Sequence, residues 1–238
     1  MTRRRVGRPP PATPTAGPGS PFPRGVLAGP SLDAARAILG ALLVRDADPG
    51  DPSGERRVGR IVEVEAYIGE EDRASHARMG PTARNRVMFG PPGLAYVYLV
   101  YGMHHCLNVV TEPELRPAAL LIRAVEPLAG EERMRQARAA DRSRRSDAVA
   151  RPVADARLAA GPGRVASAFG IDRSHTGLDL CDPASPLRLE LPPADETRPD
   201  VRATPRIGIA YAGEPWASKP WRLVVPDSPS LSGPRGGR

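Results

Sequence analysis

The sequence predicts a single domain of mixed α/β class. Stretches with the alternation or the continuous apolar character of β-strands recur along the chain, and segments with apolar residues at helical spacing lie between them. A length of 238 residues with 40% hydrophobic residues is enough for one large core. Because neither a repeat nor a strong domain boundary interrupts the chain, we expect one folded unit over residues 26–226.

Both ends of the chain differ from this unit in composition. Residues 1–25 consist mainly of Arg, Pro, Gly, Thr and Ala and contain almost nothing to bury. This composition predicts a disordered, basic and proline-rich tail. Residues 227–238 are predicted to form a second, loose tail.

The first half of the domain is expected to contain one helix and four strands. Ser31 is expected to cap the helix. Its apolar positions follow at helical spacing: Leu32, Ala35, Leu39 and Leu42. Residues 58–68 are expected to form a strand, and the polar residues 69–93, with their glycines and prolines, indicate a long functional loop. Further strands are expected at about 94–101, 105–111 and 118–125.

The second half is expected to begin with a helix from Pro127 to about residue 140. Residues 141–160 are rich in Arg, Asp and Ala and predict either a continued helix or a mobile excursion. Gly161-Pro162-Gly163 leads into a short helix that ends near Gly170. Later strands are expected near residues 187–191, 206–211 and 221–225.

The formal net charge of +7 favours polyanionic partners, either nucleic acid or an anionic membrane surface. A general preference for arginine explains the charge equally well, because Lys219 is the only lysine among 34 basic residues.

Several classes of protein are excluded by composition. Cys106 and Cys181 do not make a disulfide framework, and the four histidines have neither zinc-finger nor HExxH spacing. No apolar run reaches 18 residues, and the basic N-terminus has no apolar segment after it, so neither a membrane span nor a secretory signal is expected. We therefore expect a cytoplasmic protein with reduced thiols and without a metal or other cofactor.

The most informative stretch is Gly59-Arg-Ile-Val-Glu-Val-Glu-Ala-Tyr-Ile-Gly69. Side chains alternate along a strand. One face is expected to carry Val62, Val64 and Ala66, and the other Ile61, Glu63, Glu65 and Tyr67. A carboxylate two residues from an aromatic ring could deprotonate a water beside a bound flat ring. The alternative is that Glu63 and Glu65 line the solvent-facing side of an edge strand.

A second aromatic group follows in Ala95-Tyr-Val-Tyr-Leu-Val-Tyr-Gly-Met103. Tyr96 and Tyr98 share one face of the expected strand, where tyrosines commonly serve core or cross-strand packing. Tyr101 precedes Gly102, where the strand is expected to turn. An aromatic residue at such an outward-facing tip can wedge between stacked bases.

The remaining candidates are polar. His76 lies in a polar loop, where a histidine is most often a surface residue. The same loop is basic through Arg78, Arg84 and Arg86. Arg123 interrupts an apolar strand, and a buried arginine requires a carboxylate or phosphate partner, in a functional site or in an ion pair with an acid such as Glu126. Gly161-Pro-Gly-Arg164 could present backbone N–H groups to a phosphate.

The motifs occur in a fixed order. They are Gly59–Gly69, Asp72, Ser75-His76, Arg84-Asn-Arg86, Met88-Phe89, Pro92-Gly93, Tyr96-Val-Tyr98, Tyr101-Gly-Met103, Cys106, Asn108, Leu121-Ile-Arg-Ala-Val-Glu-Pro127, Gly161-Pro162, Arg206-Ile-Gly208 and Lys219-Pro220. In this order they resemble the alkyladenine (3-methyladenine) DNA glycosylase family, from about residue 27 to about residue 226. Relatives commonly carry further basic residues within the segments that correspond to Met79–Asn85 and Pro215–Lys219.

The resemblance implies a mixed α/β (α+β) fold, a single domain with a curved, mostly antiparallel β-sheet flanked by helices. It implies a base-excision repair enzyme that flips alkylated or deaminated purines out of double-stranded DNA and hydrolyses the N-glycosidic bond. The expected product is an abasic site, and the expected enzyme is a monomer without cofactor.

The resemblance also implies residue roles. Glu65 matches the general base, and Arg123 with the backbone of Ile207 matches groups that hold its water. The base pocket is implied to contain Tyr67, Ala74, His76, Tyr98 and Asn108, the last of which crowds the amino group of normal guanine. Intercalation is implied for Tyr101 with Met103 beside it, and contacts to DNA for Arg84, Arg86, Gly102 and Arg164.

A non-catalytic nucleic-acid-binding protein on the same fold is the main alternative, because basic charge and an aromatic wedge serve binding equally well. Glu65 distinguishes the two, since only the enzyme needs it. A basic RNA-binding β protein ranks below both, because the sequence has no RRM or KH motif. Strand cleavage through a Schiff base is not expected, since Lys219 lies far in sequence from the pocket motifs.

Overall fold

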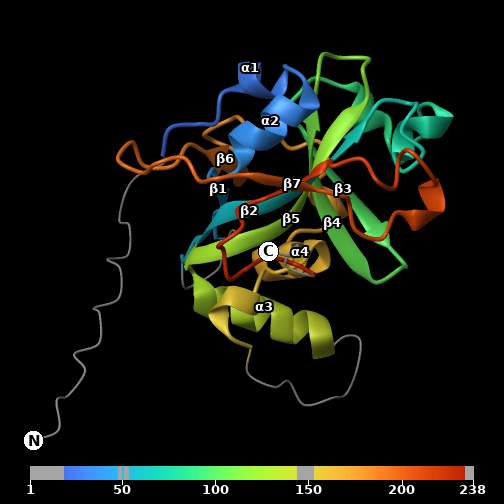
Figure 1. Cartoon of the computed structure of the whole chain (residues 1–238). Helices are drawn as coiled ribbons and strands as arrows, with labels where there is room; N and C mark the ends of the chain where they lie inside the picture. Colours follow the sequence, from blue (N-terminus) through green and yellow to red (C-terminus); the bar gives the residue numbers. More distant parts are fainter. Residues whose placement is uncertain (1–18, 48–49, 51–53, 144–152, 234–238) are drawn as a thin grey trace, which may run out of the picture.

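The computed structural model describes residues 19–47, 50, 54–143 and 153–233 (Figure 1). Within these residues, eight strands form one antiparallel sheet. The strands are β1 (Leu42–Arg45), β2 (Arg57–Ile68), β3 (Ala95–Val100), β4 (His104–Thr111), β5 (Ala118–Ala129), β6 (Leu187–Glu190), β7 (Arg202–Thr204) and β8 (Arg222–Val224). The α-helices are α1 (Arg24–Leu27), α2 (Ser31–Ile38), α3 (Glu131–Ser143) and α4 (Pro162–Phe169). The expected mixed α/β fold with a mostly antiparallel sheet is confirmed.

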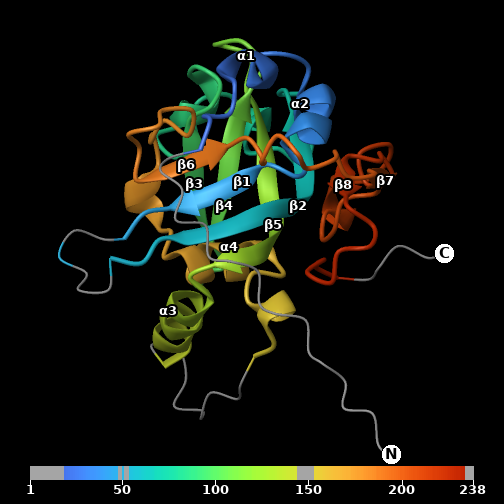
Figure 2. The ribbon, with the colours of Figure 1, turned by 90° about the vertical axis from the view of Figure 1, so that its left-hand side faces the viewer.

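The sheet branches at β2. Its main path runs β3-β4-β5-β2-β1-β6, and β8 also pairs with β2 and carries β7 on its other side. The first part of β2, residues 57–60, pairs with β1, whereas residues 63–65 pair with β8. Figure 2 shows β7 and β8 to one side of the molecule, apart from β1 and β6. The strand with the acidic motif is therefore central, and the edge-strand alternative for Glu63 and Glu65 is wrong.

A β-bulge marks the change of partner in β2. The register against β5 shifts between Ile61 and Glu63, and the intervening Val62 is the extra residue. Ile61 therefore joins Val64 and Ala66 in the main core, while Val62 belongs to a second, smaller hydrophobic cluster. The expected faces of Ile61 and Val62 are thus exchanged, because a strict two-residue period does not survive a bulge. Beyond the bulge, Glu63, Glu65 and Tyr67 keep the predicted alternation.

The main hydrophobic core lies between one face of the sheet and the helices. Its sheet residues, such as Val97, Leu107 and Ile122, alternate with polar and aromatic residues of the opposite face. From the helices, α2 contributes Ile38 and α4 contributes Phe169. Figure 1 shows α3 lying against α4 below the sheet. This division leaves the other face of β2–β5 for the site.

Four expected elements need correction. The helix expected to include Leu39 and Leu42 ends at Ile38, and Leu42 is the first residue of β1, where it pairs with β2 and β6. The helix expected from Pro127 begins at Glu131, because Glu126 and Pro127 still pair with β2. The strand expected at 206–211 is absent from the described structure, where β7 precedes it and the short 3-10 helix η5 (Ala210–Ala212) ends it. Ser31 is the first residue of α2 rather than its cap, and its hydroxyl bonds Thr111 and Glu112.

Helix α4 begins and ends as predicted. Pro162 occupies its first turn, and Gly170 follows its last residue with φ of 64°, a left-handed conformation that glycine adopts without strain. The remaining 3-10 helices are η1 (His76–Met79), η2 (Arg86–Phe89), η3 (Asp155–Arg157) and η4 (Arg173–His175). The expected alternatives for residues 141–160 are decided only in part, since α3 ends at Ser143 and residues 144–152 lie outside the described ranges.

The expected tails are shorter than their predicted bounds. Phe22 is 3% exposed and Pro21 forms a bridge with Glu190, so residues 19–25 pack on the domain. At the other end, Ser230, Leu231 and Ser232 are buried. Both segments make apolar contacts and hydrogen bonds that composition alone does not reveal. Residues 1–18 and 234–238 lie outside the described part.

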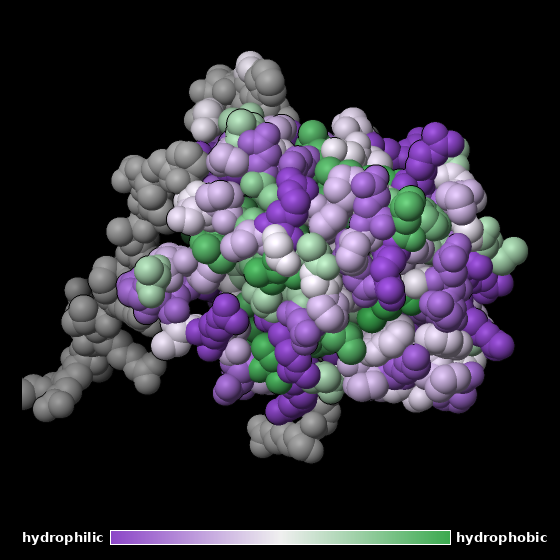
Figure 3. Space-filling model, turned by 90° about the horizontal axis from the view of Figure 1, so that it is seen from above, coloured by the Kyte–Doolittle hydropathy of each residue, from purple (hydrophilic) through white to green (hydrophobic). Residues whose placement is uncertain are grey.

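The face seen from above has a mixed character: hydrophobic residues are scattered among hydrophilic ones (Figure 3). None of the helices in the described ranges has the length and apolar character that a bilayer crossing requires.

Candidate active site

Glu65 lies at the centre of the site, fully buried in the middle of β2. Its Oε1 accepts a hydrogen bond from the backbone N–H of Ile207 at 2.7 Å. Its Oε2 accepts from the Tyr67 hydroxyl at 2.9 Å and from Arg123 Nη1 at 3.2 Å. Three donors therefore hold a buried carboxylate in one orientation. The structure brings the three predicted catalytic residues together.

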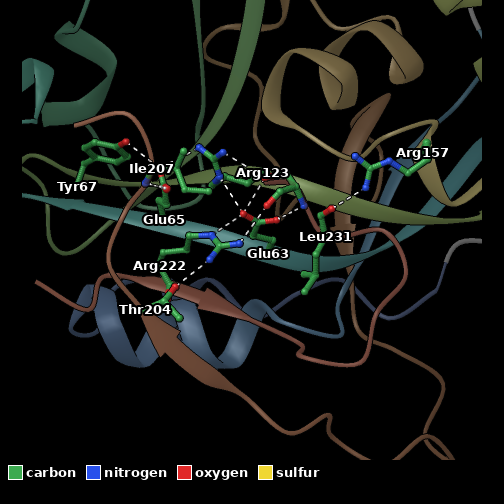
Figure 4. A network of polar contacts seen from close by, with 10 residues as sticks. Glu63, Glu65, Tyr67, Arg123, Arg157, Thr204, Ile207, Arg222 and Leu231 are labelled. Atoms are coloured by element: carbon green, nitrogen blue, oxygen red, sulfur yellow. Dashed lines mark hydrogen bonds and ion pairs between the residues drawn. The ribbon is translucent and has the colours of Figure 1, made fainter. Parts of the chain in front are cut away.

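Arg123 faces Glu65 from the neighbouring strand β5. Each of its nitrogens has a partner: Nε donates to Glu63 at 3.0 Å, Nη1 to Glu65 and Nη2 to the Ser232 hydroxyl at 3.2 Å (Figure 4). Burial by itself lowers the pKa of Arg123, but the Glu65 and Glu63 carboxylates more than offset this and raise it. The arginine thus stays charged. The buried arginine has the carboxylate partners that its burial requires, but they are Glu63 and Glu65 rather than Glu126.

Glu63 forms the second half of the network. Besides Arg123, its carboxylate accepts from Arg222 Nε at 2.7 Å and from both the backbone N–H and the hydroxyl of Ser232, at 2.6 and 2.8 Å. Two buried carboxylates and two buried guanidinium groups face one another, so the charges balance. Such pairing is what allows charges to remain buried. Glu63 is thus a support of Arg123.

Tyr67 connects the general-base candidate to the pocket. Its hydroxyl bonds Glu65, and its ring packs against the guanidinium of Arg206, whose Cζ lies 4.7 Å from the ring centroid. Burial, and then the neighbouring Glu65 carboxylate, raise the pKa of Tyr67 well above its usual value. The tyrosine therefore remains a hydrogen-bond donor to Glu65 over the whole physiological range.

Arg206 is fixed by a buried ion pair with Asp72. Nη1 lies 2.6 Å and Nη2 lies 2.9 Å from the two carboxylate oxygens, and Nη1 also donates to the carbonyl of Ala66. Both side chains are fully buried. This pair connects the loop before Ile207 to the pocket wall. Sequence reasoning placed Asp72 and Arg206 in matching motifs but gave them no role.

Ala74 lies at the pocket with its backbone already engaged. Its N–H donates to Asp72 Oδ1 at 3.0 Å, which leaves the carbonyl as the backbone group that could meet a base. The backbone contact expected from Ala74 would therefore be made by its carbonyl, which can only accept a hydrogen bond.

His76 stands at the start of η1, where the Ser75 hydroxyl caps the turn by accepting from the N–H of Ala77. Its Nδ1 lies 3.0 Å from the Tyr96 hydroxyl, and its ring meets Tyr98 edge-on with centroids 4.4 Å apart. His76 is an exposed residue, as expected for a histidine in a polar loop, but its ring packs against Tyr96 and Tyr98. The resulting desolvation of the ring, and then the Arg84 guanidinium, lower the pKa of His76 to about 4. The imidazole is therefore neutral at pH 7.

The lowered pKa of His76 can be measured directly. We expect NMR titration of its ring protons to give a midpoint near pH 4, well below the ordinary value of about 6.5. Because Arg84 contributes to the shift, Arg84→Gln should raise the midpoint, whereas Arg86→Gln is the matched control. A His76 midpoint near 6.5 in the unchanged protein would contradict this environment.

The sign of the linkage to stability follows from this lowered pKa. Between pH 4 and 6.5 the unfolded chain holds a proton on His76 that the folded chain lacks. The contribution of His76 to the free energy of unfolding therefore rises with pH through this window, and it is complete above pH 6.5.

A small pocket joins these residues. Asn108 lies in its wall, 3% exposed, with its amide nitrogen donating to the carbonyls of Tyr96 and Cys106 at 3.0 and 3.3 Å. The lining consists of Tyr67, Ala74, His76, Met88, Tyr96, Tyr98, Asn108, Ala119 and Tyr211. All five predicted pocket residues are thus brought together. Met88, Ala119 and Tyr211 were not predicted. Tyr211 comes from η5, more than 100 residues after Asn108, the last of the predicted pocket residues, and its sequence carries no signal beyond an aromatic side chain.

Burial also raises the pKa of Tyr98, which lines the pocket, and of Cys106, which contacts it. The pKa of Tyr98 is raised by burial and then by Cys106. The pKa of the Cys106 thiol is raised to about 11 by burial, although its contact with Tyr98 acts in the other direction. Both groups therefore stay neutral, and Cys106, like Cys181, is a free thiol.

Tyr101 is 87% exposed at the turn between β3 and β4. Positive φ angles of 51° at Tyr101 and 68° at Gly102 give this hairpin the left-handed backbone that favours glycine. Met103 follows at 54% exposure. The backbone thus holds two apolar side chains out in solvent, in the place expected for a wedge.

The predicted DNA-contacting arginines lie around the pocket and the turn. Arg84 packs over the Tyr98 ring, with Cζ 5.4 Å from the centroid, and Arg86 is exposed in η2. Arg164, Tyr101 and Cys106 line one hollow of about 570 Å³, and Cys106 also contacts Tyr98. Asn85 stiffens this loop, because its buried amide donates to the carbonyls of His76 and Gly80.

Within the described ranges, no three His, Cys, Asp or Glu side chains gather closely enough to hold a metal ion.

Comparison with known proteins identifies the class. The family model of methylpurine-DNA glycosylase matches residues 26–229. A candidate 3-methyladenine DNA glycosylase of Myxococcus xanthus is 46% identical over 218 residues, covering 91% of this chain and 96% of that protein. One of Methanocella arvoryzae is 47% identical over 211 residues, covering 89% and 95%. The human DNA-3-methyladenine glycosylase is 42% identical over 204 residues, covering 85% of this chain and 65% of the human protein.

These matches define a DNA-repair glycosylase. The chain belongs to the methylpurine-DNA glycosylase family. The family expected from the ordered motifs is thereby confirmed, and DNA is the substrate class that this membership implies.

Proposed function

We propose that this chain flips alkylated or deaminated purines out of double-stranded DNA and hydrolyses their N-glycosidic bond with a water that Glu65 activates. The observation that carries the proposal is the buried Glu65, held by three donors directly beside an aromatic pocket. A non-catalytic binder has no use for such a carboxylate. We further propose that the enzyme acts as a monomer.

The reaction begins with extrusion of the base, which costs a few kcal/mol of stacking and pairing. Tyr101, exposed at its turn, would fill the vacated position in the duplex, with Met103 beside it. The extruded ring would enter between Tyr67 and the His76–Tyr98 pair. A purine methylated at N3 or N7 is cationic, and contact with aromatic faces contributes roughly 0.5–2 kcal/mol.

Glycosidic bond cleavage then develops positive charge on the sugar. Glu65 stabilises this charge and takes a proton from the attacking water, whose oxygen bonds the anomeric carbon as the base leaves with the bond electrons. Arg123 and the Ile207 N–H hold the carboxylate that performs this step. Asn108 crowds the position of a guanine amino group, which disfavours the undamaged base.

The products are a free base and an abasic site. Strand cleavage would require an amine nucleophile. The single lysine, Lys219, places its Nζ 3.9 Å from the ring centroid of Trp216 and 4.3 Å from that of Trp221. Since neither tryptophan lines the pocket, we propose a monofunctional enzyme.

The test uses separate duplexes that each carry one 3-methyladenine, 7-methylguanine, hypoxanthine or ethenoadenine. Alkali after incubation reports the abasic site and ranks the lesions. Failure to release any of the four bases, with retained binding to DNA, would favour the non-catalytic alternative. Breaks that arise without heat, alkali or a partner endonuclease would contradict the monofunctional reading.

Removal of the wedge should slow excision without affecting the fold. Tyr101→Ala deletes a ring whose stacking with a base contributes about 1–3 kcal/mol, so we expect a loss of roughly tenfold or more with a paired lesion. A lesion in single-stranded DNA should be affected less. Leu115→Ala, at another exposed loop position, is the control. Equal losses on both substrates would argue against a wedge.

A further inference from the structure

The segment after β8 contacts the charged residues that support Glu65. Residues 228–233, here called the C-terminal segment, return across the sheet beside β2 and β5. Ser230, Leu231 and Ser232 are each at most 4% exposed, and Leu231 packs with Val62. Arg157 donates to the carbonyl of Leu231 at 3.0 Å (Figure 4). This burial is unusual for residues near a chain end, and it places Ser232 against the charged network.

Ser232 uses every polar group that it has. Its backbone N–H and hydroxyl both donate to Glu63, and its hydroxyl oxygen accepts from Arg123 Nη2. Its carbonyl accepts from Arg222 Nη2 at 3.1 Å. One residue therefore contacts three of the four charged side chains of the network, all except Glu65 itself.

The geometry of a guanidinium explains why this matters. Its donors are fixed in one plane, so two anchors determine where the third points. Glu63 holds Nε of Arg123 and Ser232 holds Nη2, and together they direct Nη1 to Glu65. Without the Ser232 hydroxyl, Nη2 loses its acceptor and Glu63 loses a donor. Arg123 can then turn toward Glu63, away from the carboxylate that activates water.

We infer that Ser232 is a positioning residue for base excision and that the C-terminal segment completes the active site. The inference rests on the proposed function of Glu65. It reaches beyond the family match, which ends at residue 229, three residues before Ser232.

The segment supplies its own control. Ser230 is fully buried, two residues from Ser232, and its hydroxyl has no hydrogen-bond partner among the described residues. Ser230→Ala thus removes the same atom from the same segment without breaking a side-chain hydrogen bond. The comparison of Ser232→Ala with Ser230→Ala isolates the contacts to Glu63 and Arg123.

The measurements are single-turnover excision and binding to the same lesion duplex. We expect Ser232→Ala to slow excision at least tenfold with binding unchanged within about twofold, and Ser230→Ala to leave both unchanged. In the Arg123→Met background, Ser232→Ala should add little further loss, because the residue acts through that arginine. A merely structural serine would lower rate and binding together in either background.

The outcomes separate the two proposals. If the unchanged protein releases no base, the proposed function fails. If it is active and Ser232→Ala behaves like Ser230→Ala, or if the loss adds fully to that of Arg123→Met, only the positioning role is overturned. If Ser232→Ala melts below the assay temperature, Ser232→Cys takes its place with the same criteria, because a thiol of similar size is a poor donor.

Discussion

Glu65→Gln should reduce base excision by about 10²–10⁴-fold, the range that a general base commonly contributes. The glutamine amide cannot accept a proton from water. It also cannot reproduce the three accepted hydrogen bonds, since one end of the amide must present N–H to Arg123 and Tyr67 or to Ile207. Single-turnover release from the lesion that the unchanged protein processes fastest is the measurement.

Binding to lesion DNA should survive this change, because the pocket and the Tyr101 turn remain. Glu114→Gln, an exposed carboxylate in the loop between β4 and β5, is the control for a general loss of negative charge. A Glu65→Gln protein that excises within threefold of the unchanged rate would refute the assignment of the base. Loss of binding in parallel with rate would instead indicate a disturbed pocket.

Arg206→Ala should be the most destabilising single change at the site, by about 3–5 kcal/mol, because it leaves Asp72 buried and unpaired. The substitution removes two hydrogen bonds to the carboxylate, one to the carbonyl of Ala66 and the ring contact with Tyr67. Urea unfolding gives the free energy, and excision should fall as well, since the wall of the pocket loosens.

A surface pair provides the comparison for Arg206. Arg116 lies near Glu112 with 74% of its side chain exposed, and such pairs contribute at most about 1 kcal/mol, so Arg116→Ala should cost little. The double variant Asp72→Asn with Arg206→Met removes both charges and should be less destabilised than Arg206→Ala. Equal unfolding free energies for Arg206→Ala and Arg116→Ala would contradict the structural importance of the buried pair.

The sequence alone was sufficient for those elements whose pattern is local. The alternation in β2 predicted that Glu65 and Tyr67 share a face, and the glycine after Tyr101 predicted a turn with an outward aromatic residue. The predicted helix at Pro127 was wrong, because proline favours a helix start only where the preceding strand has ended. Here pairing with β2 continues past it. A long-range contact overrode a local preference.

The site was predictable where one motif contained its parts and not where the chain returns from afar. Glu63 received no role of its own from the sequence, because nothing in its neighbourhood reveals that Arg222 and Ser232 converge on it. Tyr211 and the Asp72–Arg206 pair were missed for the same reason. The ordered motifs identified the family. The roles of these supporting residues depend on contacts between distant parts of the chain, which the sequence does not reveal.

The bulge at Val62 has a consequence for how this chain can vary. The strand after it alternates between core and site, so Val64 and Ala66 are hydrophobic while Glu63, Glu65 and Tyr67 carry the chemistry. Deletion of one residue there would move every following residue of the strand to the opposite face, with carboxylates in the hydrophobic core and valines in the candidate site. Substitutions along β2 can be tested one side at a time. A one-residue deletion disrupts the core face and the site face at once. The number of residues in this part of β2 is therefore as strongly constrained as their identity.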